Sequence, residues 1–295
     1  MLAYQLGPAF RSEATVSNPL SNKKTSRLNF VLSLLSLFIC VPFVSPSARA
    51  QNPTVRIAAA ADLQPVLPAI LTQFEQATGI HAEATYQASA ALTTQIQNGA
   101  PFDVFLSADL GYPRRLIDER LADSAGIVNS SGFSDSSSPV IYAKGTLVLW
   151  TRKDSKWPTP SLATLSDPNL KRLAIANPER APYGKAAIAT LTSLKLLDTL
   201  KPKLVTAENI SQAAQFAETG NADAGLISLT SASTQHLQSI GSYFILPKDL
   251  YPPIEQGAVL ITASTQKENA HKFLTYLLST PIQQQLAKSG LTPVK

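Results

Sequence analysis

The feature that most constrains the fold is a repeated alternation of short apolar runs with segments of helical spacing. The apolar run 55–61 is followed by Leu63 to Ala77, where apolar residues recur every three or four positions until Gly79 ends the pattern. Two more strands and two more helices follow up to Arg120, and the alternation starts again near Leu173. This order predicts mainly parallel sheets with helices on their faces.

The alternation is interrupted by a segment rich in Ser, Gly and Asp at 126–139. Two similar α/β lobes fit this interruption better than one large sheet. We predict lobe 1 from 51–141 plus 257–295 and lobe 2 from 142–256, so the chain crosses twice between the lobes and forms a hinge. Open α/β sheets bind ligands outside the carboxyl ends of their strands, and two such edges face each other across a cleft that closes by hinge motion.

The N-terminus predicts export. Three basic residues, Lys23, Lys24 and Arg27, precede the apolar run 28–41, and Ala48-Arg49-Ala50 matches a cleavage site. The apolar run is shorter than the ~20 residues of a membrane-spanning helix and contains serines. We therefore predict a signal peptide over 1–50 and a periplasmic mature protein. Cleavage would also remove the single cysteine, so the mature chain would carry no disulfide.

The charge balance does not predict a nucleic-acid partner. The whole chain has a formal net charge of +5, but from Gln51 onward 20 basic residues face 19 acidic ones. The excess positive charge therefore belongs to the predicted signal peptide. A basic surface for DNA or RNA is not indicated.

Four predicted strand-to-helix turns carry small or hydroxyl residues at helix starts. Helix N-termini present unpaired N–H groups and a partial positive charge, so several of them around one cleft bind an anion without Lys or Arg. Any one of the turns alone is explained as an ordinary helix cap. The four turns are 60–62, 88–90, 182–184 and 209–211.

Several segments resemble the periplasmic molybdate-binding proteins of ABC transporters, in the type II periplasmic binding protein superfamily. The similar segments are AAAADL at 58–63, QIQNGAPFDVFLSAD at 95–109, ANPERAPYG at 176–184, LKPKLVTAENI at 200–210 and GLI at 225–227. The resemblance covers residues 54–295. It implies an α/β fold of two lobes, each with a mostly parallel sheet flanked by helices, and an oxyanion held in the cleft between them by backbone N–H groups and hydroxyls.

The resemblance also implies a set of ligand-binding positions. Two family serines fall on Asp62 and Ser89, and the second-lobe loop residue falls on Tyr183. Ile210 would act through its backbone N–H. A tyrosine of some members falls on Ser228, which is too short to reach as far, so Tyr183 is expected to supply a phenol instead.

Asp62 departs from the family pattern, because a carboxylate repels a dianion in a dry cleft. Three explanations are open: Asp62 caps its own helix, it is protonated and donates a hydrogen bond, or the ligand is not a simple dianion. We favour the cap.

Catalysis is not predicted. The sequence has no G-x-S-x-G, H-E-x-x-H or phosphate-loop signature, and its three histidines, His81, His236 and His271, are scattered. We therefore predict a monomeric, non-enzymatic binding protein that needs no cofactor, carries molybdate or tungstate as its transported ligand, contacts no metal directly, and delivers the ligand to the membrane permease of an ABC importer. The alternatives are another oxyanion such as sulfate, or ferric iron bound by the tyrosines 142, 183 and 251.

Overall fold

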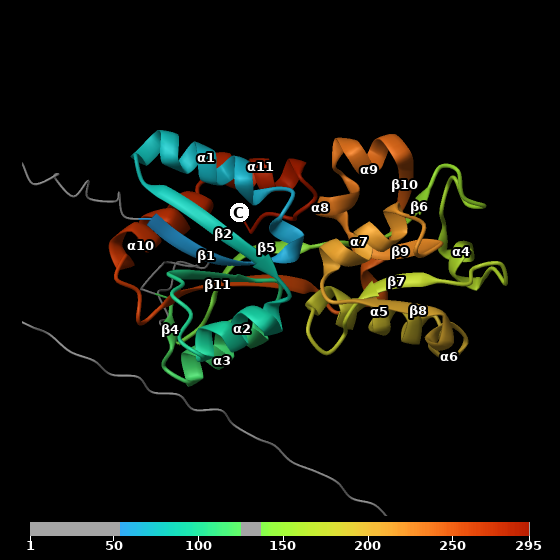
Figure 1. Cartoon of the computed structure of the whole chain (residues 1–295), viewed down its shortest axis with the longest axis horizontal. Coiled ribbons are helices and arrows are strands. Elements are labelled where there is room, and N and C mark those ends of the chain that lie inside the picture. Colours follow the sequence, from blue (N-terminus) through green and yellow to red (C-terminus); the bar gives the residue numbers. More distant parts are fainter. Residues whose placement is uncertain (1–53, 125–136, 295) are drawn as a thin grey trace, which may run out of the picture. The chain divides into compact units, whose positions relative to one another are not determined.

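A computed structural model describes residues 54–124 and 137–294. The predicted signal peptide, and all but the last three residues of the segment 126–139, lie outside the described residues. Within the described part of the chain, no helix is long and apolar enough to cross a membrane. The described residues form two sheets, each flanked by helices, as the alternating pattern predicts (Figure 1).

The first sheet has six strands in the order β2-β1-β3-β11-β4, with β5 also pairing with β11. β1 runs parallel to β2 and β3, whereas β11 is antiparallel to β3, β4 and β5. The strands are β1 (Thr54–Ala60), β2 (His81–Gln87), β3 (Val104–Ser107), β4 (Ala122–Asp123), β5 (Val140–Gly145) and β11 (Ile254–Ile261).

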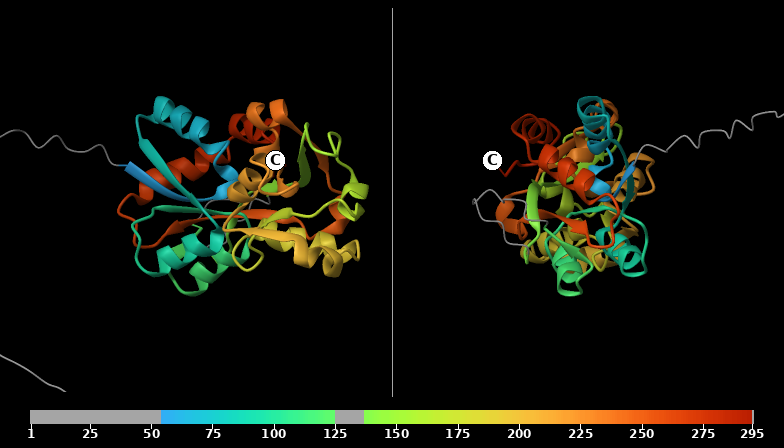
Figure 2. Two further views of the ribbon diagram at one scale, coloured as in Figure 1. Left: turned by 45° about the vertical axis from the view of Figure 1, so that its right-hand side comes forward. Right: turned by 90° about the vertical axis from the view of Figure 1, so that its left-hand side faces the viewer.

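Helices cover both faces of this sheet (Figures 1 and 2). Side chains of α1 (Leu67–Thr78), α10 (Lys267–Leu277) and α11 (Thr280–Lys288) form one buried cluster with β1 and β11. The opposite cluster contains side chains of α2 (Ser89–Gln97) and α3 (Gly111–Asp118). The alternation of side chains along β1 explains the two layers, because Ile57 and Ala59 belong to the first cluster and Ala58 to the second.

The second sheet has five strands in the order β10-β6-β9-β7-β8. Its strands are β6 (Leu147–Arg152), β7 (Leu173–Ala176), β8 (Leu204–Ala207), β9 (Ala224–Ser228) and β10 (Gly241–Ile245). The accompanying helices are α4 (Leu162–Ser166), α5 (Pro182–Ser193), α6 (Leu197–Leu200), α7 (Ile210–Glu218), α8 (Leu229–Ala232) and α9 (Gln235–Ile240), with short 3₁₀ turns η2 (Lys201–Lys203) and η3 (Lys248–Leu250). A third 3₁₀ turn, η1 (Ala61–Leu63), follows β1 of the first sheet.

The chain passes between the sheets twice, from β5 to β6 and from β10 to β11. The predicted lobe boundaries, after residues 141 and 256, fall inside β5 and β11. These two strands pair with each other from Ile254↔Gly145 to Ala258↔Val140. The strand pairing of the first sheet therefore reaches the two points where the chain passes between the sheets. A register shift between Gln256 and Gly257 interrupts that pairing close to the cleft.

The first helix begins later than the sequence pattern predicts. The spacing places its start at Leu63, but η1 and a turn come first and α1 begins at Leu67. Pro68 explains the delay, because proline lacks an N–H and is tolerated only in the first turn of a helix. The predicted end is confirmed, since Gly79 adopts a left-handed conformation with φ 71° at the C-cap.

Candidate functional site

The predicted turns converge on one small pocket between the two sheets. It encloses about 200 Å³, part of which is open to solvent. β1 and β2 of the first sheet and β7 and β8 of the second end next to it, which places the pocket at the carboxyl ends of parallel strands. The lining residues are Ala60, Ala61, Asp62, Gln87, Ala88, Ser89, Ala108, Ala181, Pro182, Tyr183, Asn209 and Ile210.

Hydrogen bonds join the two lobes around this pocket. Donors from lobe 2 reach carbonyl groups of η1, and a donor from α2 reaches the loop before α5. With the donor first, these bonds are Ser211 Oγ to Ala61 O (2.8 Å), Thr230 Oγ1 to Asp62 O (2.7 Å) and Ala90 N to Arg180 O (3.2 Å). The lobes are therefore closed on each other in this conformation.

Three helices of eight residues or more begin at the pocket. They are α2, α5 and α7, whose first residues are Ser89, Pro182 and Ile210. The first N–H groups of a helix have no partner within the helix and carry its positive partial charge. In α5 the first N–H belongs to Tyr183, because Pro182 has none. The pocket is thus surrounded by neutral donors, and its lining includes no Lys or Arg.

Ser89 adds a hydroxyl to these donors. Its side chain is buried, and Oγ accepts a hydrogen bond from Ala108 N at 3.1 Å. A serine hydroxyl has one hydrogen to donate besides its acceptor lone pairs. The Ala108 contact therefore holds Ser89 Oγ in place and leaves the hydrogen available to a ligand.

Asp62 is fully buried, and its two carboxyl oxygens have different surroundings. Tyr183 Oη donates to Oδ2 at 3.1 Å, and Gln256 Nε2 makes a very short hydrogen bond to the same oxygen. Oδ1 has no hydrogen-bond partner among the described residues. Burial raises the pKa of Asp62 to about 6, although the hydrogen bonds from Gln256 and Tyr183 act in the opposite direction.

The expectation that Asp62 caps its own helix is wrong. The N-cap position of η1 is Ala60, and no side chain caps that turn. The carboxyl group is instead held by a side chain of the other lobe, Tyr183, and by Gln256 on β11. The Tyr183 hydroxyl, from the other lobe, is buried beside the carboxyl group and donates directly to it. In these buried surroundings this hydrogen bond takes the place of a cap on the helix end.

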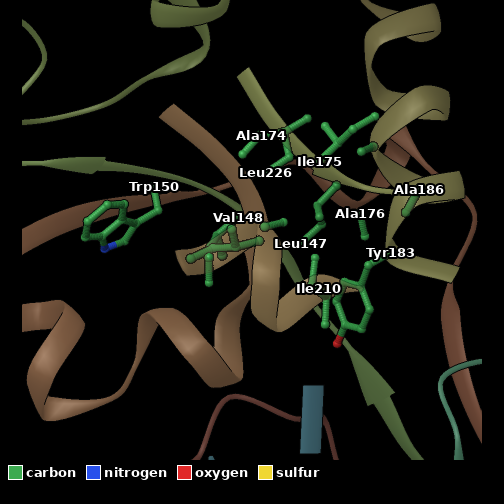
Figure 3. Packing of buried hydrophobic residues seen from close by; sticks show 14 of the residues in the cluster. Leu147, Val148, Trp150, Ala174, Ile175, Ala176, Tyr183, Ala186, Ile210 and Leu226 are labelled. Atoms are coloured by element: carbon green, nitrogen blue, oxygen red, sulfur yellow. The ribbon is translucent and has the colours of Figure 1, made fainter. Parts of the chain in front are cut away.

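Tyr183 occupies its position because two glycines allow the backbone to come close. A Cβ on Gly145 would collide with the Tyr183 hydroxyl, and a Cβ on Gly184 would collide with the carbonyl of Ala176. Figure 3 shows Tyr183 beside Ile210 at the edge of the apolar cluster of lobe 2, with its phenol oxygen pointing away from the labelled side chains. Burial and the nearby Asp62 raise the pKa of Tyr183 well above 10, so the phenol stays protonated.

Gln256 is a site residue that the sequence analysis missed. It is the only residue with a side-chain amide in the strand Ile254–Ile261, and it is fully buried. Its Oε1 has no hydrogen-bond partner among the described residues. An uncharged polar residue inside a mostly apolar, buried strand is the signal that could have identified it.

Ser228 lies next to the pocket but is not among the residues that line it. It is the N-cap of α8 and accepts from Ser231 N at 3.3 Å. Its Oγ also lies 2.9 Å from Thr230 Oγ1, which donates to the Asp62 carbonyl. Its direct contact with a ligand stays a prediction, as do the ligand contacts of the other four residues.

A larger surface hollow lies at the opposite edge of the first sheet. It encloses about 1000 Å³, much of it open to solvent, and is lined by residues that include Arg56, Phe102 and Asp103. None of the predicted ligand-binding residues reaches it. The size of a pocket does not identify the ligand site in this protein, because the convergent donors lie in the small pocket.

Two α/β lobes that close over a pocket of helix N-termini define a solute-binding protein. The family model of the bacterial extracellular solute-binding proteins matches residues 55–292. The chain belongs to this family, and within it to the group that contains the molybdate-binding proteins.

Two curated relatives and one solved structure document this membership. The molybdate-binding protein ModA of Azotobacter vinelandii is 36% identical over 250 residues, which is 85% of this chain and 93% of the relative. A Bacillus subtilis protein described as an ABC transporter substrate-binding lipoprotein is 28% identical, over 81% of this chain and 86% of the relative. The structure of the periplasmic molybdate-binding protein of Azotobacter vinelandii superposes with a TM-score of 0.72 at 29% identity, covering 81% of this chain and 98% of that one. The resemblance seen in the sequence is thereby confirmed.

Proposed function

We propose that this protein captures molybdate or tungstate in the pocket between its lobes and delivers the ion to the membrane permease of an ABC importer. The observation that carries the proposal is the pocket of neutral donors without Lys or Arg, in a chain 36% identical to a molybdate-binding protein over most of its length. Asp62, Ser89, Tyr183 and Ile210 would contact the oxygens of the ion, with Ser228 behind them.

Neutral donors suit such an ion. N–H and O–H groups make strong hydrogen bonds to charged oxygen, and they cost less to bury in the empty state than Lys or Arg would. As long as Asp62 is neutral they also discriminate against hydrogen phosphate, because a protonated oxygen needs an acceptor that N–H and O–H groups do not offer. Selection of fully deprotonated oxyanions therefore depends on these donors together with a neutral Asp62.

Ferric iron, the alternative from the tyrosines, is not favoured. Metal-binding phenols must be deprotonated, yet burial raises the pKa of Tyr142 and Tyr183 well above 10. Each phenol is also engaged within the protein. Tyr142 Oη donates to Ser107 O at 3.3 Å, and Tyr251 Oη accepts from Leu147 N at 3.1 Å.

The remaining parts of the proposal concern what surrounds the pocket. The molybdate or tungstate is cargo, held through its own oxygens, and no resident cofactor or catalytic step is needed. The protein works as an exported monomer after loss of residues 1–50. A nucleic-acid partner is not expected, because the charge of the chain beyond Gln51 is nearly balanced.

Thermal unfolding of the mature protein with added ions tests this function. Molybdate and tungstate should raise the unfolding temperature at micromolar concentrations, because binding to the folded state alone stabilises it by mass action. Sulfate should give a smaller shift and hydrogen phosphate none. A shift with ferric iron and none with any oxyanion would overturn the proposal.

A further inference from the structure

The unequal oxygens of Asp62 bear on how the pocket accepts a dianion. A carboxyl oxygen accepts about two hydrogen bonds, and Oδ2 already has two donors, Tyr183 Oη and Gln256 Nε2. Oδ1 is buried and has no partner among the described residues. The hydrogen of a neutral carboxyl group would therefore sit on Oδ1, where it has no acceptor until a ligand arrives.

The charge on Asp62 has no compensation nearby. The groups that face it are Gln256 on β11 and the phenols of Tyr183 on α5 and Tyr142 on β5, with Tyr251 close to Tyr183. All of them are uncharged near neutral pH, and no Lys or Arg in the described part of the chain contributes to its pKa. Lys185 on α5, which does not line the pocket, is half-exposed, and its Nζ lies 3.8 Å from Asp109 Oδ2. A dianion and an ionised Asp62 would repel each other across this pocket.

We propose that Asp62 acts in the pocket as a neutral carboxylic acid, that it donates its Oδ1 hydrogen to the bound oxyanion, and that the protein takes up one proton with each dianion. This inference rests on the proposed function and adds a specificity-determining residue to it. Gln256, which does not line the pocket, is a positioning residue that acts through Asp62.

The chemistry of the step is balanced. In the ligand-free protein the carboxylate is ionised above pH 6, since its pKa is about 6 even in the closed, buried conformation. Binding of the dianion draws one proton from solvent to Oδ1, and the O–H donates to an oxygen of the ion. No bond of the ion breaks, and the net charge of the closed complex changes by −1 relative to the ionised protein. Release of the ion returns the proton.

Calorimetric titration with molybdate at micromolar concentration, between pH 6 and 8.5, tests the inference. The apparent affinity should fall about tenfold per pH unit well above pH 6, because only the protonated fraction of the protein binds. At pH 8 the binding heat should differ between Hepes and Tris buffers by the difference between the ionisation enthalpies of the two buffers, as expected for uptake of one proton. A flat pH profile with no proton uptake would overturn the inference and leave the proposed function intact.

The variant Asp62→Asn supplies a permanent neutral donor of the same shape. Its affinity should not vary over this pH range, its proton uptake should vanish, and at pH 8 it should bind about 100-fold more tightly than the unmodified protein. Weaker binding than the unmodified protein at pH 8 would contradict the inference. The absence of binding by both proteins at every pH would overturn the proposed function as well.

Two further variants separate the role of Asp62 from general effects. Asp103→Asn alters another buried carboxyl group of lobe 1, away from the pocket, and should keep the slope and the proton uptake. Gln256→Met removes a hydrogen bond that lowers the pKa of Asp62, so the fall in affinity should begin at a higher pH. An unchanged pH profile in Gln256→Met would show that Gln256 does not act through Asp62.

Discussion

Two buried aspartates in lobe 1 show what distinguishes the binding edge of the sheet from its structural edge. Asp103 precedes β3 at the amino end of the sheet, where Oδ2 accepts from Arg56 N at 2.7 Å and Oδ1 accepts from Ser264 Oγ at 2.6 Å. Asp62 follows β1 at the carboxyl end, where one oxygen has two donors and the other has none. Both side chains are almost completely buried, so the difference lies in their hydrogen bonds.

The comparison teaches that burial alone does not identify a functional residue. Asp103 accepts from the backbone of β1 and from Ser264, so each of its oxygens has a partner within the protein. Asp62 lines the pocket and keeps one oxygen without a partner, which costs the folded state stability until a proton or a ligand compensates for it. The predictions below test whether these two carboxyl groups have separate roles.

The largest effect is expected for Asp103→Ala. The substitution leaves the Arg56 N–H and the Ser264 hydroxyl without their buried acceptor, which should lower the free energy of unfolding by about 3 kcal/mol. Urea denaturation at pH 7 measures the loss, and molybdate affinity should remain unchanged. If molybdate affinity fell by more than the loss of folding stability explains, Asp103 would also contribute to binding, and the two aspartates would not have separate roles.

Asp62→Asn should have the opposite effect on stability, and only at higher pH. The folded pKa of Asp62 is about 6 and its ordinary value is 3.8, so the folded state binds more protons than the unfolded chain between these values. The stability contributed by Asp62 is therefore fully present below pH 3.8 and is lost as the pH rises through 6.

Replacing Asp62 by Asn removes this loss. The variant should be more stable than the unmodified protein by on the order of 2 kcal/mol at pH 8, with the difference growing from pH 4 to pH 7. Urea denaturation without ligand at pH 4.5, 6 and 8 measures it. A difference in the free energy of unfolding that does not change with pH would mean that the buried charge of Asp62 does not destabilise the folded state.

The smallest effect is expected for Ser89→Ala. Loss of one hydroxyl donor should weaken molybdate binding about tenfold, which corresponds to about 1.4 kcal/mol. The pH dependence of the affinity should stay that of the unmodified protein, because Ser89 does not titrate in this range. Calorimetry at pH 6 and 8 checks both expectations, and unchanged affinity would remove Ser89 from the site.

Most of the fold follows from the sequence because its signals are local. Apolar periodicity located the principal strands and helices, and Gly79 marked the end of α1 through its left-handed backbone. The spacing alone could not separate η1 from α1, since Leu63 continues the apolar pattern although the helix starts only at Leu67. Short irregular turns depend on proline and on tertiary contacts more than on periodicity.

The pocket was predictable in part. The turns at Asp62, Ser89, Tyr183 and Ile210 were found as helix starts, and the structure brings all four residues to one pocket. Gln256 could not be placed from the sequence, because it reaches Asp62 across 194 positions through the pairing of β11. The contact of Asp62 with Tyr183 depends on closure of the two lobes, which no local pattern encodes.

The most direct test of the central claim is a crystal structure of the mature protein grown with tungstate, with anomalous scattering measured at a tungsten absorption edge. The account predicts one strong anomalous peak between the lobes, with oxygens of the ion within hydrogen-bond distance of Ser89 Oγ, Asp62 Oδ1 and the backbone N–H groups of Tyr183 and Ile210. An empty pocket, or a peak only in the hollow beside Arg56, would contradict it.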